Sequence, residues 1–307
     1  MAAECGVAGR VIARECAGLA VRYYCEMRSV LAKSLLVPTY LLAAALTACG
    51  SASTTPAAAP AAPVASTAPA PAPTPAAPSP ALQAALDATD RTDADRALDP
   101  GRKPVEVLGF FRVAPGQKIE ELFSGGGYTT ELLARVVGAG GANGVVYAQN
   151  TKEILDKFAR KPWTERMTHA AMKPAVAVER PIDDPIPPEA KDLDAVIMIL
   201  NYHDTVWMGA DRAKMNAAVF AALKHGGVYG IVDHSAVDGS GTRDSETLHR
   251  IDEQVVKQEV LAAGFKLDGE SDVLRNPADH RDWNGSPHAA ADKRGTSDRF
   301  VLRFVKP

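Results

Sequence analysis

The chain has 307 residues, of which 46% are hydrophobic and 23% are charged, a composition typical of a globular protein. Its formal net charge of −3 is the sum of +2 in residues 1–50, no charge in residues 51–80 and −5 in residues 81–307. Residues 81–307 are therefore mildly acidic, and nucleic acid is not expected as a partner. All four cysteines lie in the first fifty residues, which excludes a disulfide, a thiolate nucleophile and a cysteine-ligated metal elsewhere in the chain.

From Met27 the sequence reads MRSVLAKSLLVPTYLLAAALTACG, a layout typical of a secretory signal. Arg28 and Lys33 form a positive head, and the apolar stretch 35–46 is too short to span a bilayer as a helix. The ending LTAC resembles the lipobox of bacterial lipoproteins, and this implies cleavage before Cys49 and lipidation of that cysteine. We therefore expect a membrane-anchored lipoprotein on the periplasmic face, or a cytoplasmic protein if the signal is not used. A buried apolar helix that ends in cysteine is the alternative.

The signal is expected to cover residues 27–48, and residues 1–26 are interpreted as an over-extended start. Residues 49–80 are expected to form a tether. Their part from 51 onward contains nine prolines and twelve alanines without a single charge. Such a segment cannot bury enough apolar area to offset its ordering entropy, so we expect a semi-extended spacer with a reach of at most about 90 Å.

Residues 81–307 form the expected globular domain, which is large enough for one substantial core. Helical spacing is found at 87–98 and in a helix opened by Pro104. Short apolar runs then predict strands at 118–123, 145–149, 175–178, 195–200, 228–233, 265–270 and 299–306. Amphipathic stretches between them predict helices at 130–137, 154–158, 211–223 and 248–263.

This alternation of strand and helix predicts a mainly parallel sheet covered on both faces. No helical pattern separates the last two strands, so they should pair antiparallel. The expected fold class is α/β, with a doubly wound, mainly parallel seven-stranded sheet and an antiparallel last strand.

Three sequence elements occur in an order that resembles one family. The first, KIEELFSGGGYTTELL at 118–133, is a strand that ends in an acidic residue and is followed by a glycine-rich turn into a helix. Glycines let the backbone approach a ligand closely, and a helix start offers free amides. The others are LKHGG at 223–227 and AAGFKL at 262–267. Together they resemble the class I S-adenosylmethionine-dependent methyltransferases over residues 100–307, and the wider sequence resembles a group of bacterial predicted methyltransferases.

The resemblance implies that S-adenosylmethionine is the cofactor and that a methyl group passes to a small-molecule or protein acceptor that the sequence does not identify. The implied cofactor-binding residues are Glu121, Ser124, Gly125, Gly127, Gln149, Asn150 and Asn201. In the family an acidic residue ends the second strand and binds the ribose. Here that strand ends in Gln149 and Asn150, and neutral amides form weaker hydrogen bonds than a carboxylate.

Polar residues follow the fourth and fifth strands, where ligands bind in open α/β sheets. NYHD at 201–204 and DHS at 233–235 are expected to converge there. We predict His203 as a catalytic base or orienting residue with Asp204 holding its ring, and His234 as the second candidate.

Two alternatives apply to this cluster. The histidines could cap the strands, and Asp204 with Asp233 could hold Mg²⁺, as in some methyltransferases of this fold. No fixed ligand spacing supports the ion, so no metal is assigned. His249 and Arg250 could face the same crevice, but we expect them to be solvated residues at a helix start. The loop 271–298 is either a lid or a disordered surface loop.

Two other functions compete with methyl transfer. A nicotinamide dehydrogenase would need Gly or Ala where Thr130 stands, together with an acidic ribose ligand, and both are missing. An exported binding protein that kept the scaffold without the reaction is the stronger rival. The export signal favours it, since S-adenosylmethionine is made in the cytoplasm, whereas the glycine loop and the strand-end cluster favour the enzyme.

Overall fold

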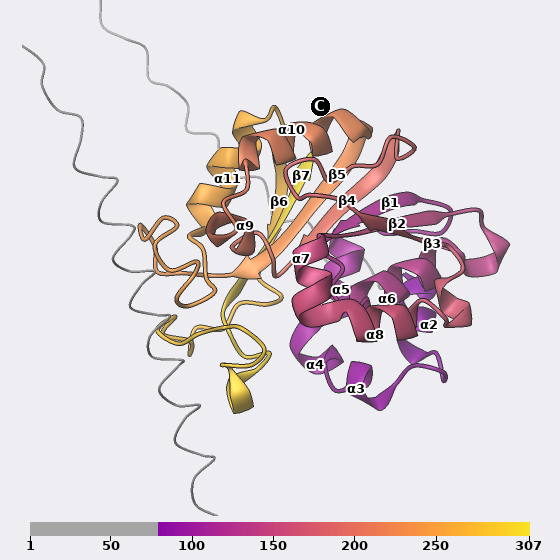
Figure 1. Cartoon of the computed structure of the whole chain (residues 1–307), viewed down its shortest axis with the longest axis horizontal. Helices are drawn as coiled ribbons and strands as arrows, with labels where there is room; N and C mark the ends of the chain where they lie inside the picture. The colour runs from indigo at the N-terminus through magenta and orange to yellow at the C-terminus, as the bar shows by residue number, and fades with distance from the viewer. Residues whose placement is uncertain (1–78) are drawn as a thin grey trace, which may run out of the picture. The chain divides into compact units, whose positions relative to one another are not determined.

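The computed structural model describes residues 79–307, which form a sheet with helices on both faces (Figure 1). The expected signal, the lipidation site at Cys49 and the tether up to residue 78 lie outside the described residues. Among the described helices, none combines the length and the apolar character that a membrane span requires.

Seven strands form the sheet in the order β3-β2-β1-β4-β5-β7-β6. They are β1 (Lys118–Leu122), β2 (Val145–Asn150), β3 (Ala175–Glu179), β4 (Leu193–Ile199), β5 (Leu223–His234), β6 (Lys266–Ser271) and β7 (Arg299–Val305). Neighbours from β3 to β5 pair in parallel, and β7 pairs antiparallel with both β5 and β6. The expected fold class is confirmed. Strand β5 begins earlier than expected, because Leu223 already pairs with Leu193 before a register shift.

The helices lie mostly where the sequence predicts them. They are α2 (Pro80–Asp87), α3 (Asp93–Arg96), α4 (Asp99–Arg102), α5 (Pro104–Phe110), α6 (Tyr128–Val137), α7 (Lys152–Ile154), the π-helical turn η2 (Leu155–Ala159), α8 (Arg160–Arg166), α9 (Asp204–Trp207), α10 (Arg212–Ala222) and α11 (Glu253–Ala262). Short 3₁₀ turns are η1 (Ala139–Gly141), η3 (Ala170–Met172) and η4 (Ala291–Lys293).

Two helix predictions were wrong. The single helix expected at 87–98 is divided between the end of α2 and the separate α3, which Thr92 caps by accepting a hydrogen bond from the Asp95 amide. The helix expected from 248 begins at Glu253, because the Asp252 side chain caps it and Ile251 forms an isolated bridge with Ser235. Tertiary pairing therefore removed the first turn of the expected helix.

The sheet is buried on both faces. Along β4, Ala195 and Ile197 face the apolar cluster that contains α2, α5 and α6, while Val196 and Met198 face the cluster that contains α10 and α11. The helix groups lie on opposite sides of the sheet in Figure 1. A continuous apolar run such as that of β4 is the sequence consequence of a parallel strand covered on both faces.

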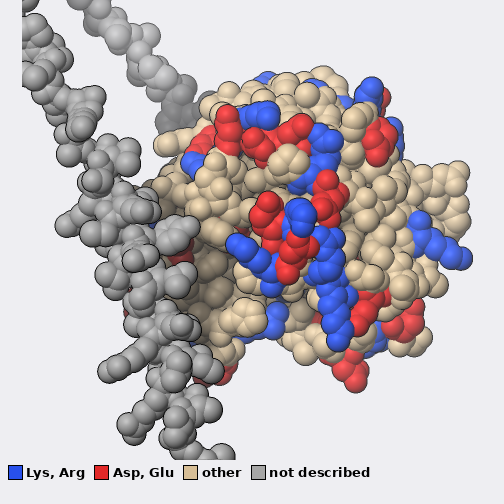
Figure 2. Space-filling model, in the orientation of Figure 1, with Lys and Arg blue, Asp and Glu red and all other residues tan. Residues whose placement is uncertain are grey.

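Charged side chains of both signs are intermixed on the face of the molecule seen in Figure 2. A chain of exposed ion pairs runs from Lys152 of α7 through Asp156 of η2 and Arg160 of α8 to Glu179 of β3. Exposed pairs of this kind contribute little to stability, so the arrangement mainly balances charge.

The loop between β6 and β7 is held in place by a buried ion pair. Arg250 and Asp279 are both almost fully inaccessible, and the Arg250 Nη1 lies 2.9 Å from the Asp279 Oδ2. Arg281 adds a second link, to Asp298 at 2.9 Å. The sequence-based alternative of a disordered loop was therefore wrong.

One ionisable side chain inside the sheet lacks a hydrogen-bond partner among the described residues. Glu120 of β1 is completely buried, and neither of its carboxyl oxygens has a hydrogen-bond partner among residues 79–307. Burial raises the pKa of Glu120 to about 9. The folded chain therefore holds this carboxyl group in its neutral form at pH 7.

The free energy of unfolding should consequently depend on pH through Glu120. The unfolded chain releases this proton near pH 4.5 and the folded chain only near 9, so stability should fall by up to about 1.4 kcal/mol per pH unit as the pH rises between them. Glu120→Gln cannot ionise and should lose this slope in urea unfolding of the full chain. Glu106→Gln, at an exposed position of α5, should keep it. An unchanged slope in Glu120→Gln would contradict the assignment.

Candidate functional site

The glycine loop connects β1 to α6 at the carboxyl edge of the sheet. Glu121 is buried at the end of β1 and accepts a hydrogen bond from the Thr130 hydroxyl at 2.5 Å. Burial raises the pKa of Glu121, although hydrogen bonds to the side chains of Thr130, Ser124 and Thr129 act in the opposite direction. Ser124 donates its amide to the Gln149 carbonyl and accepts the Gly127 amide on its own carbonyl, both at 2.9 Å. The loop is thus tied to both β1 and β2.

Only one of the predicted loop glycines borders open space. Gly125 has a left-handed φ of +56°, and a side chain there would meet nothing within 4 Å. A Cβ on Gly127, whose φ is +84°, would lie 2.7 Å from the Arg166 Cδ and 3.1 Å from the Trp163 ring. Helix α8 therefore covers the end of the loop, and Gly125 is the position that a ligand could approach.

The amides at the end of β2 are engaged with the protein itself. Gln149 accepts the Phe123 amide at 3.0 Å and donates to the Arg180 carbonyl at 2.7 Å. Asn150 accepts the Gly125 amide at 2.8 Å and donates to the Gly125 carbonyl at 3.3 Å. Both side chains are buried, so ribose binding by either would require the exchange of these bonds. Their role as ribose ligands stays a prediction.

Asp233 joins the ends of β4 and β5. Its Oδ2 accepts the His203 backbone amide, and its Oδ1 accepts both the His203 Nδ1 and the His234 backbone amide, each at 2.7 Å. The ring of His203 is thus held at its Nδ1 by Asp233, while its Nε2 also lies 3.2 Å from the Oδ1 of Asp204, the partner that the sequence suggested. Asp233 is fully buried and both of its oxygens accept hydrogen bonds, so binding of Mg²⁺ together with Asp204 would require the exchange of some of these bonds.

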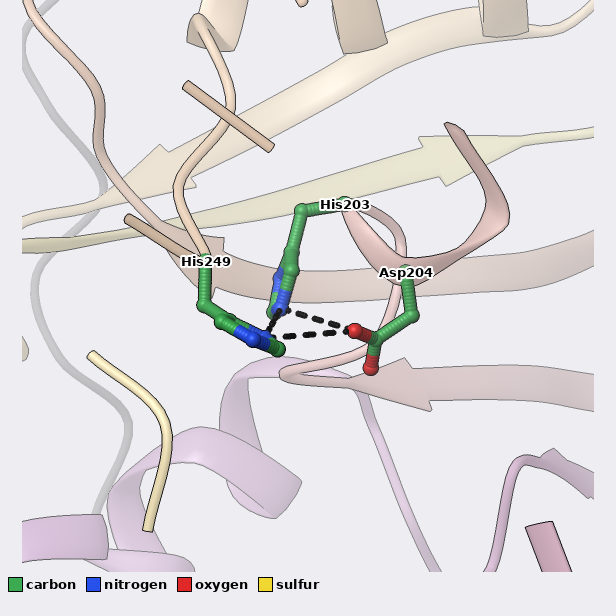
Figure 3. Close-up of side chains that lie close together, drawn as sticks. All are labelled: His203, Asp204 and His249. Atoms are coloured by element: carbon green, nitrogen blue, oxygen red, sulfur yellow. Dashed lines mark hydrogen bonds and ion pairs between the residues drawn. The ribbon is translucent and has the colours of Figure 1, made fainter. Parts of the chain in front are cut away.

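Three side chains, those of His203, Asp204 and His249, converge next to Asp233 (Figure 3). The His203 Nε2 lies 3.2 Å from the Asp204 Oδ1 and 3.2 Å from the His249 Nδ1, and the last two atoms are 3.4 Å apart. Each offers one potential metal ligand. His249 belongs to the segment before α11, where the sequence indicated a solvated helix residue. That expectation was wrong, because Ile251 pairs with Ser235 and brings His249 to the strand ends.

Arg250 also departs from the sequence expectation. Besides its ion pair with Asp279, it donates to the Trp283 and Ser235 carbonyls at 2.9 and 3.0 Å. It is fully buried and fixes the backbone next to His249. The sequence signal available for both residues was their position after the fifth strand, but no local pattern indicated that they turn inward.

The remaining predicted residues lie around the cluster. Asn201 donates its side-chain amide to the Asp204 Oδ2 at 3.0 Å, and Trp207 donates to the Asp204 Oδ1 at 2.8 Å. The Nδ1 of His234 lies 2.7 Å from the Ser297 hydroxyl, and the His234 ring is 5.8 Å from that of His203. The structure therefore brings Asn201, His203, Asp204 and His234 together, as expected for the ends of neighbouring parallel strands.

Electrostatics separate the two strand-end histidines. Burial opposes the protonation of His203, but Asp233 and Asp204 outweigh it and raise the pKa of His203 to about 10. Burial lowers the pKa of His234 well below its usual range, and the charge of His203 acts in the same direction. The two carboxylates thus favour the protonated form of His203 at neutral pH. This charge agrees with the orienting role that the sequence predicts for His203, and its role as a base stays a prediction.

A small pocket borders the same strand ends on the α5 and α6 side of the sheet. Its lining includes Tyr128 at the start of α6, Leu200 after β4 and Val232 of β5. Two arginines also line it, Arg102 and Arg299. Among residues 79–307 neither has a carboxylate partner. Arg102 lies 4.4 Å from the centre of the Tyr128 ring, and Arg299 donates only to the backbone carbonyls of residues 295 and 297.

These arginines bring two positive charges to the pocket, and the surrounding carboxylates act on them only from beyond ion-pair distance. Arg299 is only 5% exposed, and burial lowers its pKa to about 10, with the charge of Arg102 acting in the same direction. A buried charge without a partner is unfavourable, so an anionic group bound between the arginines would be stabilised. No sequence pattern indicated this site, since the two residues belong to α4 and β7.

Comparisons with known proteins bear on the fold. No protein-family model matches the sequence, and no curated protein matches it. Similar solved structures include a SAM-dependent methyltransferase from Aquifex aeolicus, 17% identical, with a TM-score of 0.49 over 71% of this chain and 100% of that one. A SAM-dependent O-methyltransferase from Thermotoga maritima is 18% identical, with a TM-score of 0.40 over 67% and 64%. The [4+2]-cyclase SpnF is 15% identical, with a TM-score of 0.46 over 70% and 81%.

The two loop glycines should differ in their effect on stability. Gly127→Ala adds a Cβ against Arg166, which is pinned by its bonds to Asp95 and the Gly126 carbonyl, and should lower the free energy of unfolding by about 2–4 kcal/mol. Gly125→Ala carries only the left-handed backbone strain and should cost about 1–2 kcal/mol. Urea unfolding of the full chain measures both. Equal losses would show that α8 does not pack on the loop as described.

Proposed function

We propose that the domain transfers methyl groups from S-adenosylmethionine to an acceptor molecule. The observation that carries this proposal is the glycine loop at the β1–α6 junction, with Gly125 open to a ligand at the carboxyl edge of the sheet. Ligands of open α/β sheets bind at this edge, and the start of α6 directs backbone amides towards it. The sheet order and the buried acid Glu121 at the end of β1 support the same proposal.

The pocket supports the proposal through its charge. The methionine part of S-adenosylmethionine ends in a carboxylate, and the partnerless Arg102 and Arg299 offer guanidinium groups for such an anion. The apolar lining, including Leu132, Ile199 and Leu274, would exclude water from the bound molecule. The position expected for the ribose gives weaker support, because the side chains of Gln149 and Asn150 already form hydrogen bonds with the Arg180 carbonyl and the Gly125 amide.

When bound, the sulfonium group of the cofactor supplies an electrophilic methyl group, so the protein is required mainly for positioning. The rigid strand ends meet this need, since Asp233 fixes the loop after β4 and Arg250 fixes the segment before α11. His203, as a cation between carboxylates, would orient the anionic Asp204 towards the crevice. We propose Asp204, at 12% side-chain exposure, as the group that meets an acceptor hydroxyl or amine.

A second candidate is an exported binding protein that carries out no methyl transfer. The observation that favours it is the inward orientation of Gln149 and Asn150, which leaves no free acceptor at the family's ribose position. The two candidates differ in cofactor binding, which can be measured without knowledge of the acceptor.

We further propose that the domain is tethered to a membrane through lipidated Cys49, on the periplasmic side. Support comes from the sequence: the positive head, the apolar stretch and the LTAC ending precede an uncharged, proline-rich spacer. The spacer is long enough to let a domain work at a distance of several nanometres from its anchor.

Cofactor binding should depend on Gly125. Calorimetric titration of the full chain with S-adenosylmethionine or its demethylated product should give binding, and Gly125→Ala should weaken it at least about tenfold, because the new Cβ projects into the ligand's space. Gly226→Ala is a matched control: its φ is +75° and its Cβ would also meet nothing, but it lies at the opposite end of β5. Absence of heat for both ligands in the wild type would favour the binding-protein candidate.

Lipidation should depend on Cys49. Expressed from Met27 in a Gram-negative host, the chain should incorporate labelled fatty acid and sediment with membranes, whereas Cys49→Ala should do neither, since the acyl chain is attached to that sulfur. Cys25→Ala in the full-length reading frame, which leaves the LTAC sequence intact, is the control. An unlabelled, soluble wild type that retains its N-terminus would overturn the anchor.

A further inference from the structure

The geometry points to a binding site for a divalent transition-metal ion formed by His203, Asp204 and His249, and we propose it as such. The His203 Nε2, the Asp204 Oδ1 and the His249 Nδ1 form a triangle with sides of 3.2, 3.2 and 3.4 Å (Figure 3). An ion about 2.0–2.2 Å from each of three ligands needs them roughly 3.0–3.5 Å apart, so these atoms are already spaced for coordination.

The ligands are also held in the manner of a metal site. Ligating histidines usually donate their second ring nitrogen to a carboxylate, and here the His203 Nδ1 is bonded to the Asp233 Oδ1 at 2.7 Å. This bond leaves the Nε2 of His203 directed at the triangle, and an ion bound there would displace the proton that this nitrogen carries in the cation. Asp204 is oriented in turn by hydrogen bonds from Asn201 and Trp207.

His249 is fixed by its neighbours in the chain. It has a left-handed φ of +50°, which is uncommon for a residue other than glycine. The Leu248 carbonyl accepts the Gly285 amide at 2.8 Å, and Arg250 is locked in its buried ion pair with Asp279. These contacts hold the His249 ring against His203, with ring centres 5.2 Å apart.

The site is open on one side only. The His249 side chain is 27% exposed, that of Asp204 12% and that of His203 3%, so an ion could enter past His249. Three protein ligands leave coordination positions free for water or for an oxygen of a bound molecule. Two imidazoles and one carboxylate suit zinc, iron or cobalt better than magnesium, which prefers oxygen ligands.

This inference does not depend on methyl transfer, because the ion and its ligands can be studied without the cofactor. If the chain is a methyltransferase, an ion at this position would lower the pKa of a coordinated acceptor hydroxyl. The proposed ligand set differs from the pair Asp204 and Asp233 considered from the sequence, since Asp233 supports His203 instead of facing the ion.

The test uses the full chain with Cys5, Cys16, Cys25 and Cys49 changed to Ser, so that thiolates do not compete for the ion. Titration with Zn²⁺ by calorimetry and with Co²⁺ by visible absorption should give one equivalent per chain. His249→Ala should weaken Zn²⁺ binding at least about tenfold, the minimum loss seen when even a supporting residue is removed. Asp204→Ala provides a second variant with the same expected loss.

His280→Ala is the matched control, because His280 is an exposed histidine of the loop between β6 and β7 and lies outside the triangle. It should bind Zn²⁺ as the wild type does. The proposal is overturned if the wild type binds less than one equivalent, if His280→Ala loses as much affinity as His249→Ala, or if Mg²⁺ binds more tightly than Zn²⁺. Circular dichroism of each variant confirms that the fold is retained, so that a loss of binding reports on the ligand.

Discussion

The organisation of the site depends on one buried carboxylate, that of Asp233. It accepts three hydrogen bonds, two from His203 and one from the backbone of His234, and it is completely inaccessible to solvent. A buried charge is costly unless it is paired and hydrogen-bonded, and the ring and backbone of His203 together with the His234 amide supply both for Asp233. Because the backbone and the ring of His203 are held together, the end of β4 is fixed relative to β5, and the remaining imidazole nitrogen can point in only one direction.

The charges of the side chains around Asp233 alternate in sign. Cationic His203 lies between Asp233 and Asp204, and burial keeps the adjacent His234 neutral. A second positive region, formed by Arg102 and Arg299, lies in the pocket on the α5 and α6 side of the same strand ends. The carboxyl edge of the sheet therefore has a polar cluster after β4 and β5 and a mainly apolar pocket with two arginines on the α5 and α6 side.

The sheet order explains why the glycine loop and the histidine cluster adjoin. Strands β1 and β4 are parallel neighbours, so the loop after β1 and the turn after β4 emerge at the same edge. Helix α8 narrows the approach to the loop, because Arg166 bonds the Gly126 carbonyl and extends to Asp95 and Glu131. Among the loop glycines, Gly125 is the one whose Cβ position has no neighbouring atom within 4 Å, so a ligand of the loop could approach there.

Apolar periodicity and strand direction are encoded locally. The sequence could therefore predict the seven strands, the antiparallel last pair and the glycine loop, and also that residues 201–204 lie near residues 233–235. It did not determine the partners of individual side chains. The contacts that form the site join segments far apart in the chain. Asp233 binds His203, and Asn150 binds Gly125. His249 and Arg250 turn inward, and Arg102 and Arg299 line the same pocket. Such contacts follow from the packing of the whole domain, and no local pattern specifies which of several nearby polar groups forms the hydrogen bond.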